Sequence, residues 1–408
     1  MRPDVDVLAP PARRAPVALW AAALLPVLLV AGLVAWIVRS GPADAVRGEG
    51  YPPVEVLSIE RAELAPGLIR VTVLNDGPDP VKIAQVMVDD AYWTFTATNG
   101  TELSHLGRTT LEIPYPWVHG ESHTIVLVTS TGLTFEHTIP VAVPTPRPNA
   151  RSVWLFTLIG VYVGVLPVAI GLLWYPLVTR LGRRGLDFVL ALTIGLLIFL
   201  VVDASHDAIE VVGTLPGSYQ GAALLVFGAA GAYIGIEVLG RWLSARRADA
   251  AGRSWTMALL VAVGIGLHNF SEGLAIGAAF SLGEAALGSL LIIGFTLHNT
   301  TEGLAIVAPL ARNASSWSRV PIGRLLLLGL IGGAPTILGA WLGGFTYARV
   351  WSLLFLAIGI GAIAQVTVQI LGQLAGDRPL SRYITERPVV AGLATGAAVM
   401  YVTGMLVG

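Results

Sequence analysis

Apolar residues run through most of the chain in long blocks, and the first block covers residues 17–38, after Arg13 and Arg14. Its 22 residues are enough for a helix to cross roughly 30 Å of hydrocarbon. A cleaved signal peptide is the alternative, but the apolar core of such a peptide usually spans only about 7–15 residues. We therefore predict an uncleaved anchor helix within residues 1–40, with the N-terminus in the cytoplasm.

Between residues 50 and 145 the pattern changes to short runs of β-branched residues separated by turns. Residues 68–74 and 124–128 are typical of strands, and the sequence NDGP at residues 75–78 is typical of a turn. About six or seven such strands predict an all-β sandwich, immunoglobulin-like in outline. Residues 144–148, PTPRP, form a stiff linker. The aromatic residues expected to supply the core are Trp93, Phe95, Tyr115 and Trp117.

Eight further apolar segments follow the linker, and each is long enough to span a bilayer as a helix. Helices are the only plausible spanning structure for such segments, because a helix satisfies its own backbone hydrogen bonds. These segments predict an eight-helix domain over residues 150–408. They cover residues 153–178, 186–212, 221–243, 255–280, 285–310, 322–345, 351–374 and 389–407.

Arginines collect in every second connection between the predicted helices. The alternate connections, near Pro216, Gly283 and Arg349, hold a single arginine between them. Because arginine-rich loops stay in the cytoplasm, the sandwich and the C-terminus are both expected outside the cell, in a multi-pass protein of the plasma membrane. The clusters are Arg180, Arg183 and Arg184; Arg241, Arg246, Arg247 and Arg253; Arg312, Arg319 and Arg324; and Arg378, Arg382 and Arg387.

Composition agrees with a membrane protein whose main surroundings are a lipid bilayer. Hydrophobic residues make up 54% of the 408 residues and charged residues 12%, against roughly 25% charged in soluble proteins. The net charge of −1 argues against a nucleic-acid partner, which would need a basic face. The chain has no cysteine, so disulfides, thiolate metal sites and a cysteine nucleophile are excluded.

One pattern, H-N-x-x-E-G-L-A-I, occurs twice inside the fourth and fifth apolar segments, beginning at His268 and at His298. In each copy the histidine and the glutamate are four residues apart and share a helix face, with the asparagine on the neighbouring stripe. Both histidines are 15 residues from Gly283, so an antiparallel hairpin brings both sets to one depth, roughly 22 Å from the outer surface. The six residues are His268, Asn269, Glu272, His298, Asn299 and Glu302.

Imidazole, carboxamide and carboxylate groups at one depth suit a divalent first-row metal ion. The alternative is that these are polar residues hydrogen-bonded between packed helices. For a lone histidine or asparagine that alternative would be the better interpretation. A glutamate this deep in a membrane costs at least about 2.5–3.5 kcal/mol. Two glutamates would also repel each other unless a cation or a proton lies between them. The doubled set therefore favours a metal site.

Eight spanning helices with H-N-x-x-E-G in the fourth and again in the fifth resemble the ZIP family of divalent-metal transporters, over about residues 153–408. The resemblance implies metal binding by all six motif residues, with the two glutamates able to bridge adjacent metal positions. It implies inverted symmetry between helices one to three and six to eight, and alternating access around a midplane site. The metal, Zn²⁺ first and Fe²⁺ or Mn²⁺ next, would be a transported substrate and not a cofactor. A homodimer is left open, and no catalysis is expected.

The chain departs from the family pattern at several positions. Ser271 and Thr301 stand where family members commonly have a proline before the motif glutamate, which leaves the helix kink there in question. Ala334 precedes Pro335 where a glutamate is frequent, and Gln365 and Gln369 stand near frequent acidic positions. These departures favour one main metal site over a binuclear one.

Two other groups of residues could bind metal. Asp203 and His206 are three residues apart at the end of the second segment, with Asp203 the deeper candidate ligand; a helix end that faces water is the alternative. Four histidines of the sandwich could capture metal, although surface histidines are more often incidental. They are His105, His119, His123 and His137.

Two other function classes compete with transport. A membrane-embedded metallohydrolase would use a metal-activated water with glutamate as general base. However, the spacing here is H-x-x-x-E and not the H-E-x-x-H of a zinc protease helix. A metal-sensing receptor would use the sandwich to bind a partner, and its intramembrane ligands would bind metal without flux.

Overall fold

The structure is a computed structural model that describes residues 17–40, 52–246, 250–282, 284–311, 321–375 and 379–405. It divides into two compact units, Met1–Val54 and Glu55–Gly408. Several residues used in the topology prediction, together with residues 406–407 of the last predicted segment, lie outside the described residues. These are Arg13, Arg14, Arg247, Gly283, Arg312, Arg319 and Arg378.

The first unit contains α1 (Val17–Ser40), a helix at the predicted anchor. Its described side chains, Leu24–Trp36, are apolar, and most of the large ones are exposed, as Leu28 and Trp36 are. This part is shorter than the helices of the second unit that could cross a membrane. The helix is therefore confirmed, and its role as an anchor stays a prediction.

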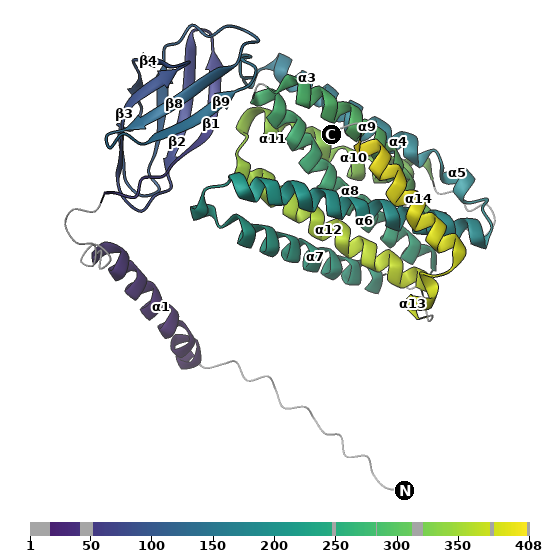
Figure 1. Cartoon of the computed structure of the whole chain (residues 1–408). Helices are drawn as coiled ribbons and strands as arrows, with labels where there is room; N and C mark the ends of the chain where they lie inside the picture. The colour runs from purple at the N-terminus through teal and green to yellow at the C-terminus, as the bar shows by residue number, and fades with distance from the viewer. Residues whose placement is uncertain are drawn as a thin grey trace. The chain divides into compact units, whose positions relative to one another are not determined.

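The β region of the second unit consists of two antiparallel sheets (Figure 1). One has the order β1-β2-β7-β5, and the other has the order β4-β3-β8-β9, with β6 paired to β3. The predicted β region is confirmed, whereas its immunoglobulin-like outline stays a prediction. The strands are β1 (Leu57–Ala65), β2 (Leu68–Asn75), β3 (Val81–Val88), β4 (Ala91–Trp93), β5 (Thr96–Ala97), β6 (Glu102–Leu103), β7 (Arg108–Ile113), β8 (His123–Thr129) and β9 (Thr134–Ile139).

The core between the two sheets is aliphatic. Ile69 and Val71 of β2 and Leu127 of β8 are completely buried, because alternate residues of each strand point to the same face. The predicted aromatic core is wrong in this respect. The four aromatic residues named above are only partly buried and pack against this aliphatic cluster.

Among the described residues, seven helical spans are long and apolar enough to cross a membrane, which indicates a multi-pass membrane protein. They correspond to the first seven predicted segments. The first span is built from α3 (Ala150–Gly160), the π-helical turn η1 (Val161–Val165), α4 (Leu166–Leu172) and α5 (Tyr175–Val178). The others are α6 (Arg183–Thr214), α7 (Gly221–Ala245) with the preceding turn η2 (Gly217–Tyr219), α8 (Ala250–Ser281), α9 (Ala285–Ala311), α10 (Ile322–Gly333) with α11 (Pro335–Thr346), and α12 (Arg349–Ala375).

The eighth predicted segment forms a helix, α14 (Arg387–Gly404), after the short α13 (Leu380–Tyr383), but α14 is not among the seven spans. It packs closely on α6, where a Cβ added to Gly392 would lie 2.3 Å from the carbonyl oxygen of Phe188. It therefore belongs to the bundle, while an eighth membrane crossing stays a prediction.

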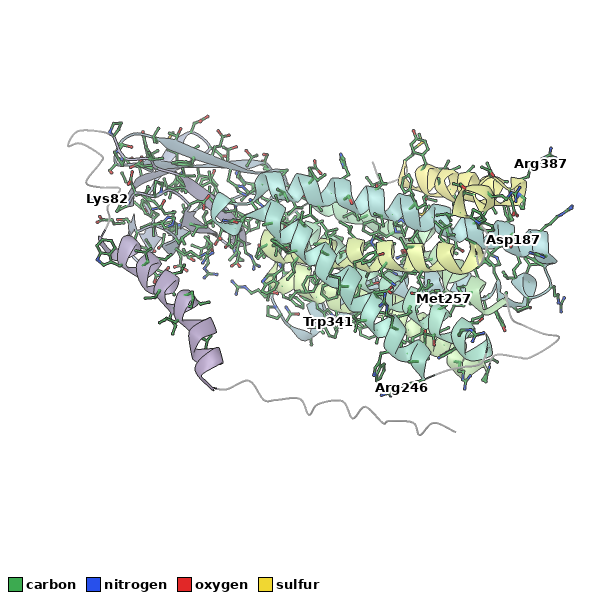
Figure 2. All side chains as sticks on the ribbon, turned by 90° about the horizontal axis from the view of Figure 1, so that it is seen from below. Lys82, Asp187, Arg246, Met257, Trp341 and Arg387 are labelled. Carbon is green, nitrogen blue, oxygen red and sulfur yellow. The ribbon has the colours of Figure 1, made fainter. Side chains whose placement is uncertain are left out.

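The helix α8 lies inside the bundle, in contact with α9, α11 and α12. The helix α7 lies at the edge of the bundle (Figure 1). Within the apolar window of each span, 72% of α8 is buried against 6% of α7. Asp187 and Arg387 lie at the end of the bundle away from the β-strands (Figure 2).

Candidate metal centre

The two copies of the repeated motif lie on neighbouring helices, one on α8 and one on α9, which contact each other. All six motif residues are buried, and none is more than 6% exposed. The structure therefore brings together the six residues on which the sequence-based metal prediction rests.

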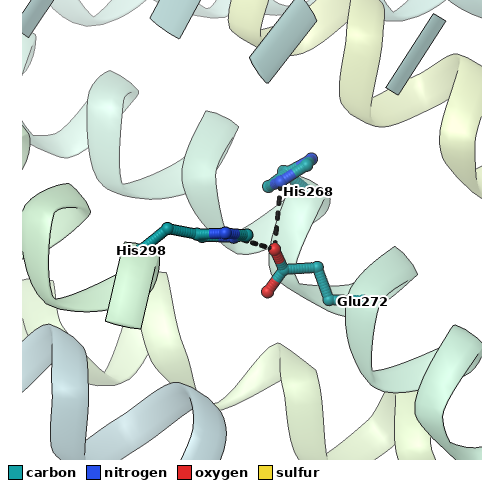
Figure 3. A group of neighbouring side chains, drawn as sticks. All are labelled: His268, Glu272 and His298. Atoms are coloured by element: carbon teal, nitrogen blue, oxygen red, sulfur yellow. Dashed lines mark hydrogen bonds and ion pairs between the residues drawn. The ribbon is translucent and has the colours of Figure 1, made fainter. Parts of the chain in front are cut away.

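Three of the six form a compact group of ligand atoms, His268 and Glu272 from α8 and His298 from α9 (Figure 3). One ligand atom from each lies within 4.8 Å of the other two. The Glu272 Oε1 atom is 3.3 Å from His268 Nε2 and is paired directly with His298 Nε2. Two imidazole nitrogens and a carboxylate oxygen thus converge, a donor set that a divalent transition metal accepts.

The two asparagines exchange hydrogen bonds with the carboxylates of the opposite helix. Asn269 Nδ2 donates to Glu302 Oε2 at 2.9 Å, and Asn299 Nδ2 donates to Glu272 Oε2 at 2.9 Å. Each motif therefore orients the glutamate of the other motif. Only the hydrogen bond from Asn299 acts on the histidine–carboxylate group, because Glu272 belongs to that group and Glu302 does not.

Each asparagine amide also donates to a backbone carbonyl that lies where a regular α-helix is interrupted. Asn299 donates to the oxygen of Val163, inside the π-helical turn η1, at 3.1 Å. Asn269 donates to the oxygen of Gly332 at 3.0 Å, just before the break at Ala334 between α10 and α11. π-Helical turns are frequent at functional sites. Because both NH₂ groups are occupied in this way, the orientation of each amide is set.

Several polar atoms at the centre are buried and, among the described residues, have no hydrogen-bond partner. A buried polar group without a partner costs about 1–3 kcal/mol, so such atoms call for an explanation. Each of them is an acceptor in at least one form, and a cation would satisfy acceptors. They are His268 Nδ1, Asn269 Oδ1, Asn299 Oδ1 and Glu302 Oε1.

The glycine that follows each motif glutamate allows another helix to approach closely. A Cβ added to Gly273 would lie 2.1 Å from the carbonyl oxygen of Thr336 in α11. A Cβ added to Gly303 would lie 2.2 Å from the carbonyl oxygen of Val168 in α4. In both copies the glutamate is followed directly by glycine. The glutamate therefore belongs to the polar centre, while the glycine packs against another helix.

Both motif helices are continuous at Ser271 and Thr301, the residues that precede the motif glutamates. The hydroxyls of Ser271 and Thr301 donate to the carbonyl oxygens of His268 and His298, each at 2.6 Å. The helices α8 and α9 run through these positions without a break. A break does occur in the sixth segment, at Ala334.

Gln365 and Gln369 lie apart from the histidine–carboxylate group. Gln365 Nε2 donates to Glu237 Oε2 of α7 at 2.7 Å and to Gln369 Oε1 at 3.2 Å, and Arg241 pairs with Glu237 at 2.7 Å. The sequence-based prediction did not include Glu237. The sequence could have indicated it, because Glu237 is the one acidic residue within the predicted span at residues 221–243.

Asp203 and His206 lie on α6 with exposed side chains, and neither is part of the group formed by His268, Glu272 and His298. The role of Asp203 as a ligand stays a prediction.

The described residues of the sandwich contain no cluster of histidines and carboxylates of the kind found between α8 and α9. Instead, His105 Nδ1 pairs with the carbonyl oxygen of Gly77 at 2.7 Å. His123 is buried, and its Nδ1 pairs with Asp89 at 2.7 Å. These two histidines have structural partners, which weakens the prediction of metal capture.

No protein-family model matches the chain, and no curated protein matches it either. The chemistry of the centre therefore rests on the geometry of its buried residues.

Proposed function

We propose that the chain carries divalent transition-metal cations through a membrane into the cytoplasm, Zn²⁺ first and Fe²⁺ or Mn²⁺ next, as members of the ZIP family do. One observation carries the proposal. His268, Glu272 and His298 converge from adjacent helices inside a bundle of seven spans that are apolar enough to cross a bilayer. An ionisable group inside a membrane protein marks an ion pathway by default, because burying it is costly.

The donor set supports a transition metal as the transported substrate. Two imidazoles favour zinc, iron or nickel, and the carboxylate also admits manganese. His268, Glu272 and His298 would replace part of the hydration shell of the ion, while Asn299 holds the second oxygen of Glu272. A single divalent cation would also balance the two negative charges of the buried Glu272 and Glu302, so the centre suits one main metal position.

The surroundings of the centre support alternating access. The asparagines of α8 and α9 reach helix interruptions in two different spans, at Val163 and at Gly332. Interrupted helices beside a buried site are typical of secondary transporters. We place the arginine-rich end of the bundle in the cytoplasm and the sandwich outside, following the distribution of arginines.

Flux through reconstituted vesicles tests the proposal. The parent chain, Glu272→Ala and a control, Glu112→Gln, would be compared for Zn²⁺ and Mn²⁺ influx. The control removes an exposed sandwich carboxylate that pairs with Arg70. We expect influx in the parent and the control and a loss of influx in Glu272→Ala.

The outcomes separate the alternatives. Metal binding by the parent without influx would refute transport and favour a receptor. Influx that persists in Glu272→Ala would refute the assignment of the centre while leaving transport in place.

A further inference from the structure

Two hollows lie where the sandwich meets the ends of the helices. The larger, of about 330 Å³, is bounded by β1, β2 and β7 on one side and by the turns at residues 215–219 and 347–351 on the other. The smaller, of about 160 Å³, lies between β1, β2, the proline-rich linker and Phe345. Arg61 lines both. The two hollows are therefore neighbours at the junction.

The walls of the two hollows carry a net positive charge. Five arginines line them against two carboxylates, Glu60 and Glu63. Three of the five are paired with carboxylates: Arg108 with Glu60 at 2.9 Å, Arg61 with Glu63 at 2.9 Å, and Arg70 with Glu112 at 2.8 Å. The lining arginines are Arg61, Arg70, Arg108, Arg147 and Arg349. The charge of the lining favours an anion and disfavours a metal cation.

Hydrogen bonds hold together the elements that line the larger hollow. The Asp76 carboxylate accepts hydrogen bonds from the backbone N–H groups of Gly217, at 2.7 Å, and Ser218, at 3.1 Å. The Tyr219 hydroxyl donates to Glu60 at 2.8 Å. These bonds hold the turn between α6 and α7 against the sandwich, so the hollow is formed by structured elements.

The larger hollow also lies at the ends of spans that could cross a membrane, where a bilayer surface is expected. Tyr347 stands between two spans, Ile322–Thr346 and Arg349–Gly372, and Pro216 stands between α6 and α7. Tyrosine and tryptophan are enriched at the level of lipid headgroups, and Tyr219, Tyr347 and Trp351 line this hollow. Phosphate groups of phospholipids lie at that level, and the planar guanidinium group binds phosphate with two hydrogen bonds.

We propose that the larger hollow binds a phosphate group, with an anionic phospholipid headgroup or free phosphate as its source. Arg349 from the start of α12 and Arg61 from β1 contact the phosphate oxygens, and the aromatic residues cover the site on the membrane side. This site is independent of the proposed metal transport. Its occupation joins the sandwich to the helix ends through the ligand as well as through Asp76.

The experiment uses the full chain and has two arms. In the first, nanodiscs of phosphatidylcholine and phosphatidylglycerol are loaded with protein, and native mass spectrometry counts the phosphatidylglycerol molecules retained. In the second, inorganic phosphate is titrated into protein in an uncharged detergent, and the heat of binding is measured. The variants are Arg349→Gln and Arg61→Gln, which lie on different elements. The control is Lys82→Gln, an exposed charge of the sandwich on β3, outside the lining (Figure 2).

We expect the parent and the control to retain phosphatidylglycerol, and each arginine variant to lose several-fold of that retention. Phosphate binding that the arginine variants weaken, without a difference in lipid retention, would assign the site to soluble phosphate. Equal behaviour of the parent and both arginine variants in both arms would overturn the proposal.

Discussion

The amide of Asn269 on α8 donates a hydrogen bond to Glu302 on α9 over 2.9 Å, although the two residues are 33 positions apart in the chain. Asn299 returns the same contact to Glu272. Neither copy of the motif is complete without the other, because each supplies the amide that orients the carboxylate of its partner helix. Despite this reciprocity, only Glu272 lies within reach of both histidines.

The two glutamates should therefore differ in their effect on metal binding. We expect Glu302→Gln to weaken Zn²⁺ affinity by roughly 10–100-fold, the usual effect of changing a group just outside the ligands, because it removes a buried negative charge and alters the contact with Asn269. Glu272→Gln should weaken it more, because it removes a ligand charge and the partner of His298. Calorimetric titration of Zn²⁺ into protein in detergent measures both. Equal losses would contradict the assignment of Glu272 as the main carboxylate.

The motif glycines should resist the smallest substitution. In Gly273→Ala the new Cβ meets the backbone oxygen of Thr336, which cannot rotate away, so we expect a loss of about 1–3 kcal/mol in stability. Gly303→Ala should behave alike. The control, Gly231→Ala on α7, meets nothing within 4 Å. Thermal unfolding in detergent compares the three, and the packing argument fails if Gly273→Ala unfolds at the temperature of the control.

The turn after β3 should make the sandwich sensitive to acid. Burial would raise the pKa of Asp89, but hydrogen bonds from Tyr115, Thr124 and His123 outweigh it and lower the pKa from its ordinary value of 3.8. A lowered pKa stabilises the fold above pH 3.8, and this stabilisation is lost as the pH falls through the folded value. Tyr115 also makes a pH-dependent contribution to stability, which is lost at high pH. The hydrogen bond with Asp89, then burial, raise its pKa from 10.0 to about 12, so its contribution is lost as the pH rises between these values.

Asp89→Asn tests this interpretation, since asparagine tolerates the left-handed backbone that Asp89 adopts, at a φ of 51°. We expect roughly 1 kcal/mol less stability at neutral pH, after allowing for the partial exposure of the carboxylate, and a weaker dependence on acid. Trp93, whose ring lies 4.9 Å from that of Tyr115, reports unfolding by fluorescence. Asp90→Asn, with a φ of 64°, is the matched control. Identical acid profiles for parent and Asp89→Asn would contradict the prediction.

The contact between Asp76 and the turn before α7 should be measurable by hydrogen exchange. Asp76→Ala removes the acceptor for the N–H groups of Gly217 and Ser218, so both amides should exchange faster than in the parent. Asn99→Ala, elsewhere in the sandwich, should leave them unchanged. Slow exchange that survives Asp76→Ala would show that the turn is held by other contacts.

Much of the architecture could be predicted from the sequence because it depends on local pattern. A run of apolar residues long enough for a helix predicts a span wherever the chain folds, and alternation of β-branched residues predicts strands. The repeated motif was visible for the same reason, and the spacing from Gly283 placed both copies at one depth. Burial of the six motif residues agrees with that expectation.

Tertiary structure alone decided which residues meet. Sequence spacing treats Glu272 and Glu302 alike, but the way α8 and α9 pack places only Glu272 between the histidines. The partner of Gln365 proved to be Glu237, 128 positions away, and the sandwich core proved aliphatic rather than aromatic. Periodicity determines which face of a helix or strand is apolar. The crossing of one element over another determines the contacts, and it depends on residues far apart in the chain, such as Gly273 against the backbone of Thr336.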